Sequence, residues 1–154
     1  MISKETNFKD RNPINFLLER SLGLFSDSLI SMVLFGSYAR KNYSKNSDLD
    51  LIVVLENNKN YNFSKLRRDF LLEFEKKLDL HIFSKAEVIQ NFNDFSPIFV
   101  TLLLGKRILF DKDMFFKKQF ENFIRQMLKI EIKYCEGDKI WEMKKIAINL
   151  EASH

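Results

Sequence analysis

Two short clusters have the residue types and the spacing needed for phosphate and metal chemistry. Gly36-Ser37 ends one apolar segment, and Asp48-Leu49-Asp50 begins the next after ten intervening residues. In an extended strand the side chains of Asp48 and Asp50 point to the same side, about 7 Å apart. Carboxylates this close repel each other unless a proton or a cation intervenes, and hard oxygen ligands suit Mg²⁺. The pair therefore predicts a metal site.

The residues around the first cluster could hold a phosphate. Glycine at position 36 lets the backbone approach an anion closely, while Ser37 offers a hydroxyl and the N–H groups that follow it. Asp79 would add a third carboxylate if its segment, 78–83, forms the strand beside that of Asp50. A phosphate pocket facing a metal site is the minimum for phosphoryl or nucleotidyl transfer. An Asp-x-Asp pair also arises from ordinary surface alternation, so the residues alone leave both interpretations open.

The hydrophobic pattern predicts the elements that must position these residues. Apolar runs and alternation indicate strands, and apolar residues three or four apart indicate helices. The order of elements favours an α/β (α+β) fold, a small mixed sheet flanked by helices with a C-terminal helical extension. Strands are predicted at 29–35, 49–55, 78–83 and 107–110, and helices at 13–25, 63–77, 85–92, 98–104 and 113–150, the last interrupted at Glu136-Gly137-Asp138.

Composition indicates an ordinary globular chain. Of 154 residues, 45% are hydrophobic and 16 are Phe, which is enough for a buried core in one domain. The single cysteine, Cys135, excludes an intrachain disulfide framework and favours a reducing compartment. The N-terminal stretch lacks a secretory apolar region, and no apolar run reaches the eighteen residues of a membrane span. We therefore expect a soluble, cytoplasmic protein without a membrane partner.

The charge balance is only mildly basic. A net charge of +4 arises from 25 basic and 21 acidic residues spread along the chain, which weakly favours anionic ligands. The basic stripe that marks duplex binding is absent, so no specific nucleic-acid partner is expected.

The segment LFGSYARKNYSKNSDLDLIVV resembles the signature of the DNA polymerase β-type nucleotidyltransferase superfamily, and KKLDLHIFSKAEV resembles its third-aspartate strand. The chain's size and its GSYAR wording resemble the minimal nucleotidyltransferases of bacteria and archaea, many of them antitoxins paired with HEPN toxins. The resemblance covers about residues 12–111. It implies a polymerase β-like nucleotidyltransferase domain at 1–112 and a helical extension at 113–154, packed on the same domain or at a dimer or partner interface.

The resemblance also implies roles for particular residues. Three of them would contact the nucleoside triphosphate, with ATP as the expected substrate. Three carboxylates would be catalytic and would hold two Mg²⁺ ions. These are Gly36, Ser37 and Arg40 for the nucleotide, and Asp48, Asp50 and Asp79 for the metals.

Two further residues bear on the site. Relatives commonly carry glycine where this chain has Lys41, and glycine there would permit a positive φ that lysine adopts only at a cost. By alternation His81 shares the face of Asp79. A structural or half-exposed role for this histidine is the favoured interpretation.

The leading hypothesis is therefore Mg²⁺-dependent AMP transfer (AMPylation) from ATP to a hydroxyl of a partner protein, a HEPN-type toxin. One alternative keeps the enzyme but transfers to a small-molecule hydroxyl of the aminoglycoside type. Another is a non-catalytic antitoxin or binding module with a relict site. The apolar stripes of the C-terminal segment also leave a homo-oligomer open.

Overall fold

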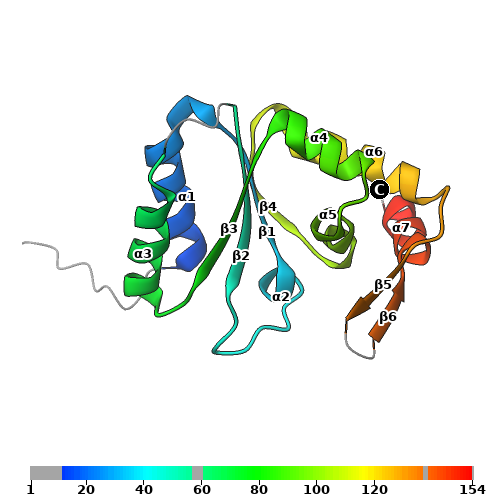
Figure 1. The fold of residues 1–154 in the computed structure, drawn as a ribbon, viewed down its shortest axis with the longest axis horizontal. Coiled ribbons are helices and arrows are strands. Elements are labelled where there is room, and N and C mark those ends of the chain that lie inside the picture. Colours follow the sequence, from blue (N-terminus) through cyan, green and yellow to red (C-terminus); the bar gives the residue numbers. More distant parts are fainter. Residues whose placement is uncertain (1–11, 57–60, 137–138, 154) are drawn as a thin grey trace, which may run out of the picture.

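The computed structural model of the protein describes residues 12–56, 61–136 and 139–153, and its fold is shown in Figure 1. The Gly137-Asp138 interruption of the predicted C-terminal helix lies outside these residues. A four-stranded sheet stands between two layers of helices, as the sequence predicted (Figure 1).

The sheet is mixed, with the strand order β3-β2-β1-β4. Strand β1 (Leu29–Phe35) pairs antiparallel with both β2 (Leu49–Leu55) and β4 (Arg107–Asp111), whereas β2 and β3 (Leu78–Ser84) run parallel. The two central strands are buried almost throughout, which explains why they are continuous apolar runs and not alternating ones.

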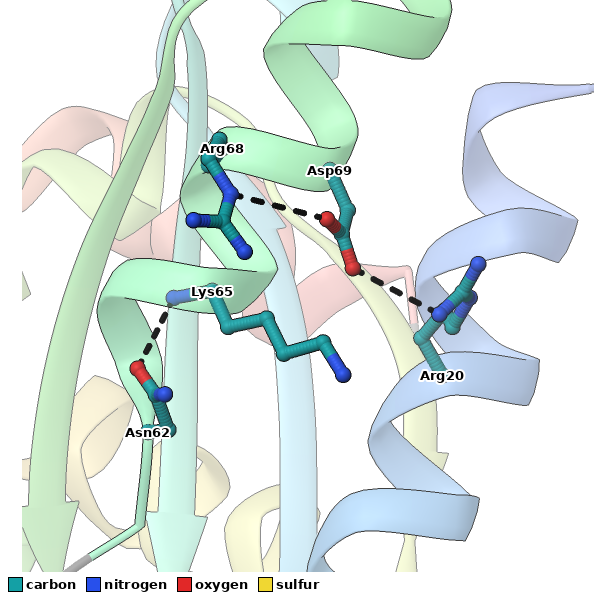
Figure 2. A network of polar contacts seen from close by, with 5 residues as sticks. All are labelled: Arg20, Asn62, Lys65, Arg68 and Asp69. Atoms are coloured by element: carbon teal, nitrogen blue, oxygen red, sulfur yellow. Dashed lines mark hydrogen bonds and ion pairs between the residues drawn. The ribbon is translucent and has the colours of Figure 1, made fainter.

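One face of the sheet is covered by α1 (Pro13–Phe25) and α3 (Phe63–Phe74). Both helices begin at an asparagine whose side-chain oxygen accepts a backbone N–H, and Figure 2 shows this contact between Asn62 and Lys65. Figure 2 also shows Asp69 of α3 between Arg20 of α1, at 3.5 Å, and Arg68, at 4.0 Å. The Arg20–Asp69 ion pair therefore joins the two helices, which also share an apolar core.

The opposite face is covered by α4 (Lys85–Asn93), α5 (Pro97–Thr101), α6 (Phe115–Met127) and α7 (Met143–Ala152). Phe116 of α6 and Ala147 of α7 are fully buried in the same core as Val33 of β1. The C-terminal extension thus packs directly onto the sheet that carries the candidate site.

The extension is not helical throughout. The expected helical stripe through Ile140 and Trp141 is wrong, because these residues lie in β6 (Lys139–Glu142), which pairs antiparallel with β5 (Lys133–Glu136). Figure 1 shows this hairpin at the same end of the sheet as α2 (Gly36–Ala39). No helix in the described part of the chain has the length and apolar character that crossing a membrane requires.

Candidate active site

The site begins where β1 turns into α2. Gly36 has a φ of 69°, and a Cβ atom built on it would lie 2.2 Å from Oδ2 of Asp50. Phe35 is paired with Asp50 across the antiparallel β1–β2 ladder, so the turn is brought directly against that carboxylate. Both the positive φ and the close contact exclude any side chain at this position, which accounts for the glycine.

Parallel pairing of β2 and β3 places the next carboxylate. Asp50 is in register with Asp79, and His81 follows two residues later on the same face of β3. The ligand atoms of Asp50, Asp79 and His81 all lie within 4.8 Å of one another, and we call these three residues the acidic cluster. The expectation that Asp79 lies on a strand beside Asp50 is confirmed.

Asp50 is strained electrostatically. Burial raises its pKa from 3.8 to about 6, and the charges of Asp79 and Asp48 act in the same direction, whereas His81 lowers it. A bound cation would remove this repulsion. The two carboxylates supply the hard oxygen ligands that Mg²⁺ prefers, so the donor set fits that ion.

Asp48 lies at the margin of the site. It precedes β2, its side chain is 47% exposed, and its Oδ2 lies 4.0 Å from Nζ of Lys77. Its carboxylate influences Asp50 but does not belong to the acidic cluster. The structure thus brings together two of the three predicted metal ligands, and the role of Asp48 stays a prediction.

His81 is more closely involved than the sequence indicated. Its Nε2 lies 3.5 Å from Oδ2 of Asp79, and its ring packs edge-on against Phe35 at 5.3 Å. This arrangement holds the imidazole against the carboxylate and can orient it. The alternation with Asp79 was the available signal, but a single histidine on a strand carries little information about its neighbours.

A pocket of about 250 Å³ adjoins the acidic cluster, and we call it the strand-end pocket. Gly36 and Asp50 form one wall, and α5 and the β5–β6 hairpin form the others. It is therefore polar on the side of the cluster and largely apolar on the other. Its lining residues are Phe35, Gly36, Arg40, Asp50, Pro97, Ile98, Thr101 and Tyr134.

Arg40 is fixed in this pocket from several sides. Its Nη1 donates a hydrogen bond to Glu136 of β5 at 3.1 Å, and its Nε is buried without a hydrogen-bond partner among the described residues. Its aliphatic stem passes so close to Gly105 that a Cβ there would lie 3.0 Å from Cγ. The guanidinium therefore lies beside the cluster with donor capacity left for an anion.

Ser37 and Lys41 lie in the segment that follows β1, and the predicted contact of Ser37 with the nucleotide stays a prediction. Ser37 is the second residue of α2, and its carbonyl accepts the N–H of Asn42. Lys41 has a φ of 59°, the positive value expected at the position where relatives commonly carry glycine. Lys41 is exposed, so the loop tolerates the lysine side chain.

The sequence of this chain is similar to those of known nucleotidyltransferases. Residues 15–149 match the family model of the nucleotidyltransferase domain. MJ1305 of Methanocaldococcus jannaschii, named as a candidate protein adenylyltransferase, is 30% identical over 139 residues, which cover 86% of this chain and 92% of the relative.

Solved structures share the fold. A toxin–antitoxin structure with AMP-PNP superposes with a TM-score of 0.51 at 15% identity, covering 75% of this chain and 87% of that chain. A mutant of the toxin–antitoxin MntA–HpeT gives 0.50 at 13% identity, covering 77% and 89%. The small mixed sheet with helices on both faces is thus the fold of these proteins.

Proposed function

This chain belongs to the nucleotidyltransferase domain family and is a nucleotidyltransferase, and from that premise we propose that it transfers AMP from ATP to a hydroxyl of a partner protein. The observation that carries the proposal is the placement of Gly36 against Asp50, with Asp79 in register on the next strand. A glycine turn beside paired carboxylates is the arrangement that phosphoryl transfer requires.

In this mechanism the triphosphate lies over the Gly36-Ser37 turn, where backbone N–H groups and Arg40 offset its charge. The acceptor hydroxyl oxygen forms a bond to the α-phosphorus, the bond from that phosphorus to the β-bridging oxygen breaks, and pyrophosphate leaves. We assign the hydroxyl proton to Asp79, which His81 would hold in orientation. The cluster's partial burial keeps these charges in a less polar environment than water.

Asp50 and Asp79 would hold Mg²⁺, with Asp48 as the additional carboxylate. The ion would stabilise the charges that develop on the attacking and leaving oxygens. This assignment is supported by the carboxylate oxygens and by the pKa of Asp50, which burial and the neighbouring carboxylates raise.

A protein acceptor is supported by the relative MJ1305, whose name describes transfer of an adenylyl group to protein. The resemblance of the GSYAR segment to minimal nucleotidyltransferases makes a HEPN-type toxin the proposed partner. The fold is shared with toxin–antitoxin structures, one of them with AMP-PNP, which agrees with an ATP-dependent antitoxin.

The test is label transfer from ATP carrying ³²P at the α-phosphate to the product of the adjacent gene, with and without EDTA. We expect label on the partner in Mg²⁺, none in EDTA, and at least a hundredfold loss in Asp50→Asn and Asp79→Asn. Asp27→Asn, an exposed carboxylate of the opposite sheet end, is the matched control and should retain activity. Nucleotide binding without label transfer would contradict a protein acceptor. Neutralisation of the partner by Asp48→Asn/Asp50→Asn would support a non-catalytic antitoxin instead.

A further inference from the structure

A second hollow lies beside the acidic cluster, at the free edge of the sheet. It has a volume of about 230 Å³ and lies between α3 and the start of β3. We call it the edge recess. It is lined by Arg67, Arg68, Leu71, Lys77, Leu78 and Asp79.

Each hollow is lined by one carboxylate of the acidic cluster, and no residue lines both hollows. Asp50 belongs to the strand-end pocket and Asp79 to the edge recess, and these two residues are neighbours in the β2–β3 ladder. A transferase must bring two substrates to one centre from different directions. Because Gly36 and Arg40 line the strand-end pocket, that side suits the triphosphate and leaves the edge recess for the acceptor.

The chemistry of the edge recess differs from that of the strand-end pocket. Three cationic side chains surround it, of which Arg68 is 67% and Lys77 is 72% exposed. Leu71 is 50% exposed at its wall, and Leu72 beside it on α3 is 74% exposed. Figure 2 shows Arg68 next to Asp69, whose other oxygen faces Arg20. Asp69 is therefore an acidic side chain that lies near both Arg68 and Arg20 in this view.

Strand β3 forms the edge of the sheet next to the edge recess. It pairs with β2 on one edge, and no strand of the described residues covers its other edge. Asp79 is 48% exposed at this edge. Its side chain shares the face of Asp50 and His81, whereas Leu78 packs with α3 on the other face, so a segment bound in the recess would reach the carboxylate around the free edge of β3.

From this arrangement we infer that the edge recess is the docking surface for the acceptor, and that it fits an acidic protein segment whose apolar side chain packs on Leu71. The inference rests on the proposed function. Charge complementarity identifies the occupant, because cations at the rim of an interface select partners of opposite charge and speed their association.

The test uses two fluorescein-labelled twelve-residue peptides, each with one tyrosine and three leucines, the remaining positions being glutamate in one and lysine in the other. Their binding to the full chain is measured by anisotropy in 50 mM salt, without nucleotide. We expect the glutamate peptide to bind at least tenfold more tightly, and the difference to shrink in 0.5 M salt.

The decisive variant is Arg67→Glu/Arg68→Glu. Its matched control is Lys117→Glu/Lys118→Glu, an adjacent pair of exposed cations on α6, which covers the opposite face of the sheet. The first variant should weaken binding of the glutamate peptide about tenfold, whereas the control should change it less than twofold. Leu71→Ala should weaken it about threefold without changing its salt dependence. Thermal unfolding of each variant shows whether the fold is intact.

Equal binding of the two peptides, or equal losses in the two charge-reversal variants, would overturn the inference. The proposed function is tested separately by binding of a fluorescent ATP analogue in Mg²⁺, which Arg67→Glu/Arg68→Glu should leave unchanged. Loss of analogue binding in Asp50→Asn with normal peptide binding supports both ideas. A wild-type chain that binds the acidic peptide but no nucleotide contradicts the proposed function and leaves the docking surface standing.

Discussion

Asp50 is held by the fold in a position that costs stability while no cation neutralises it. Its backbone is fixed near the start of β2, an otherwise buried strand, the Gly36 turn lies against it, and Asp79 faces it from the next strand. Residues at a site that binds charge are often placed at the expense of stability, because ligand binding and not folding requires their arrangement.

Replacing Asp50 by Asn should therefore stabilise the metal-free protein. The pKa of Asp50 is raised, so the folded state binds the proton more tightly than the unfolded state, and its stability falls as pH rises from about 4 through about 6. The shift corresponds to roughly 3 kcal/mol in full, and partial exposure reduces it to about 1–2 kcal/mol. We expect Asp50→Asn to be more stable by that amount at pH 8 in EDTA, and equal to the wild type near pH 4, by urea unfolding.

Magnesium should reverse the order of the two proteins. Saturating Mg²⁺ should raise the unfolding temperature of the wild type but not that of Asp50→Asn, because only the wild type keeps the paired carboxylates. Asp27→Asn should behave like the wild type under every condition. A pH-independent difference between Asp50→Asn and the wild type would contradict the electrostatic explanation.

Lys41 is a second single residue whose backbone conformation affects stability. A lysine at φ 59° pays about 1 kcal/mol for the left-handed conformation. Lys41→Gly and Lys41→Asn should equal or exceed the wild type in stability by up to about 1 kcal/mol, whereas Lys41→Val should lose about 1 kcal/mol. Thermal unfolding measures this order. Lys45→Val, in the same exposed loop, should change stability by less than about 0.5 kcal/mol, and an equal loss at both positions would argue against strain at Lys41.

At the scale of elements, the sequence predicts the strands well and the C-terminal hairpin poorly. The strands at 29–35 and 49–55 are unambiguous because continuous apolar runs bounded by Gly36 and by polar loops have few other interpretations. In β5 and β6, four-residue segments contain too few apolar positions to separate a period of two from one of 3.6. Ile140, Met143 and Ile146 also fit a helical spacing, which led to the wrong assignment.

The site was predictable to the extent that it depends on local sequence. Gly36, Asp50 and Asp79 follow from strand ends and alternation. The contact between Arg40 and Glu136 joins residues 96 positions apart, and Tyr134 enters the pocket from the same hairpin. Such contacts depend on how the C-terminal extension folds back over the sheet, and no local pattern encodes that.

The hairpin should influence nucleotide affinity through Glu136. The Glu136 carboxylate pairs with Arg40 at 3.1 Å. Its negative charge repels a triphosphate, and its ion pair occupies part of the guanidinium that would otherwise bind the phosphates. Glu136→Gln should therefore tighten ATP-analogue binding about two- to threefold at low salt. Lys139→Gln, the residue paired with Glu136 across the hairpin, removes a charge of opposite sign and should give no gain. Weaker binding in Glu136→Gln would instead show that the ion pair positions Arg40 productively.

At the scale of the whole molecule, the two helical layers are tied to one sheet. The helices α6 and α7 bury Phe116, Phe123 and Ala147 against β1 and β2, and on the other face α3 buries Phe70. The sheet that holds the acidic cluster is thus stabilised from the N-terminal and C-terminal parts of the chain together.

This architecture predicts that residues 113–153 unfold with the rest of the chain and not as a separate unit. Trp141 is the only tryptophan and lies in the hairpin, so its fluorescence reports the extension, while far-UV circular dichroism reports the whole molecule. Phe116→Ala removes a fully buried ring and should cost about 3–5 kcal/mol, shifting both signals by the same amount of urea. Phe70→Ala, equally buried on the opposite face, should also shift both signals together. If Phe70→Ala moved the dichroism transition and left the Trp141 transition in place, the extension would be an independent domain, and the coupling of the hairpin to the site through Arg40 would depend on docking between two folded units.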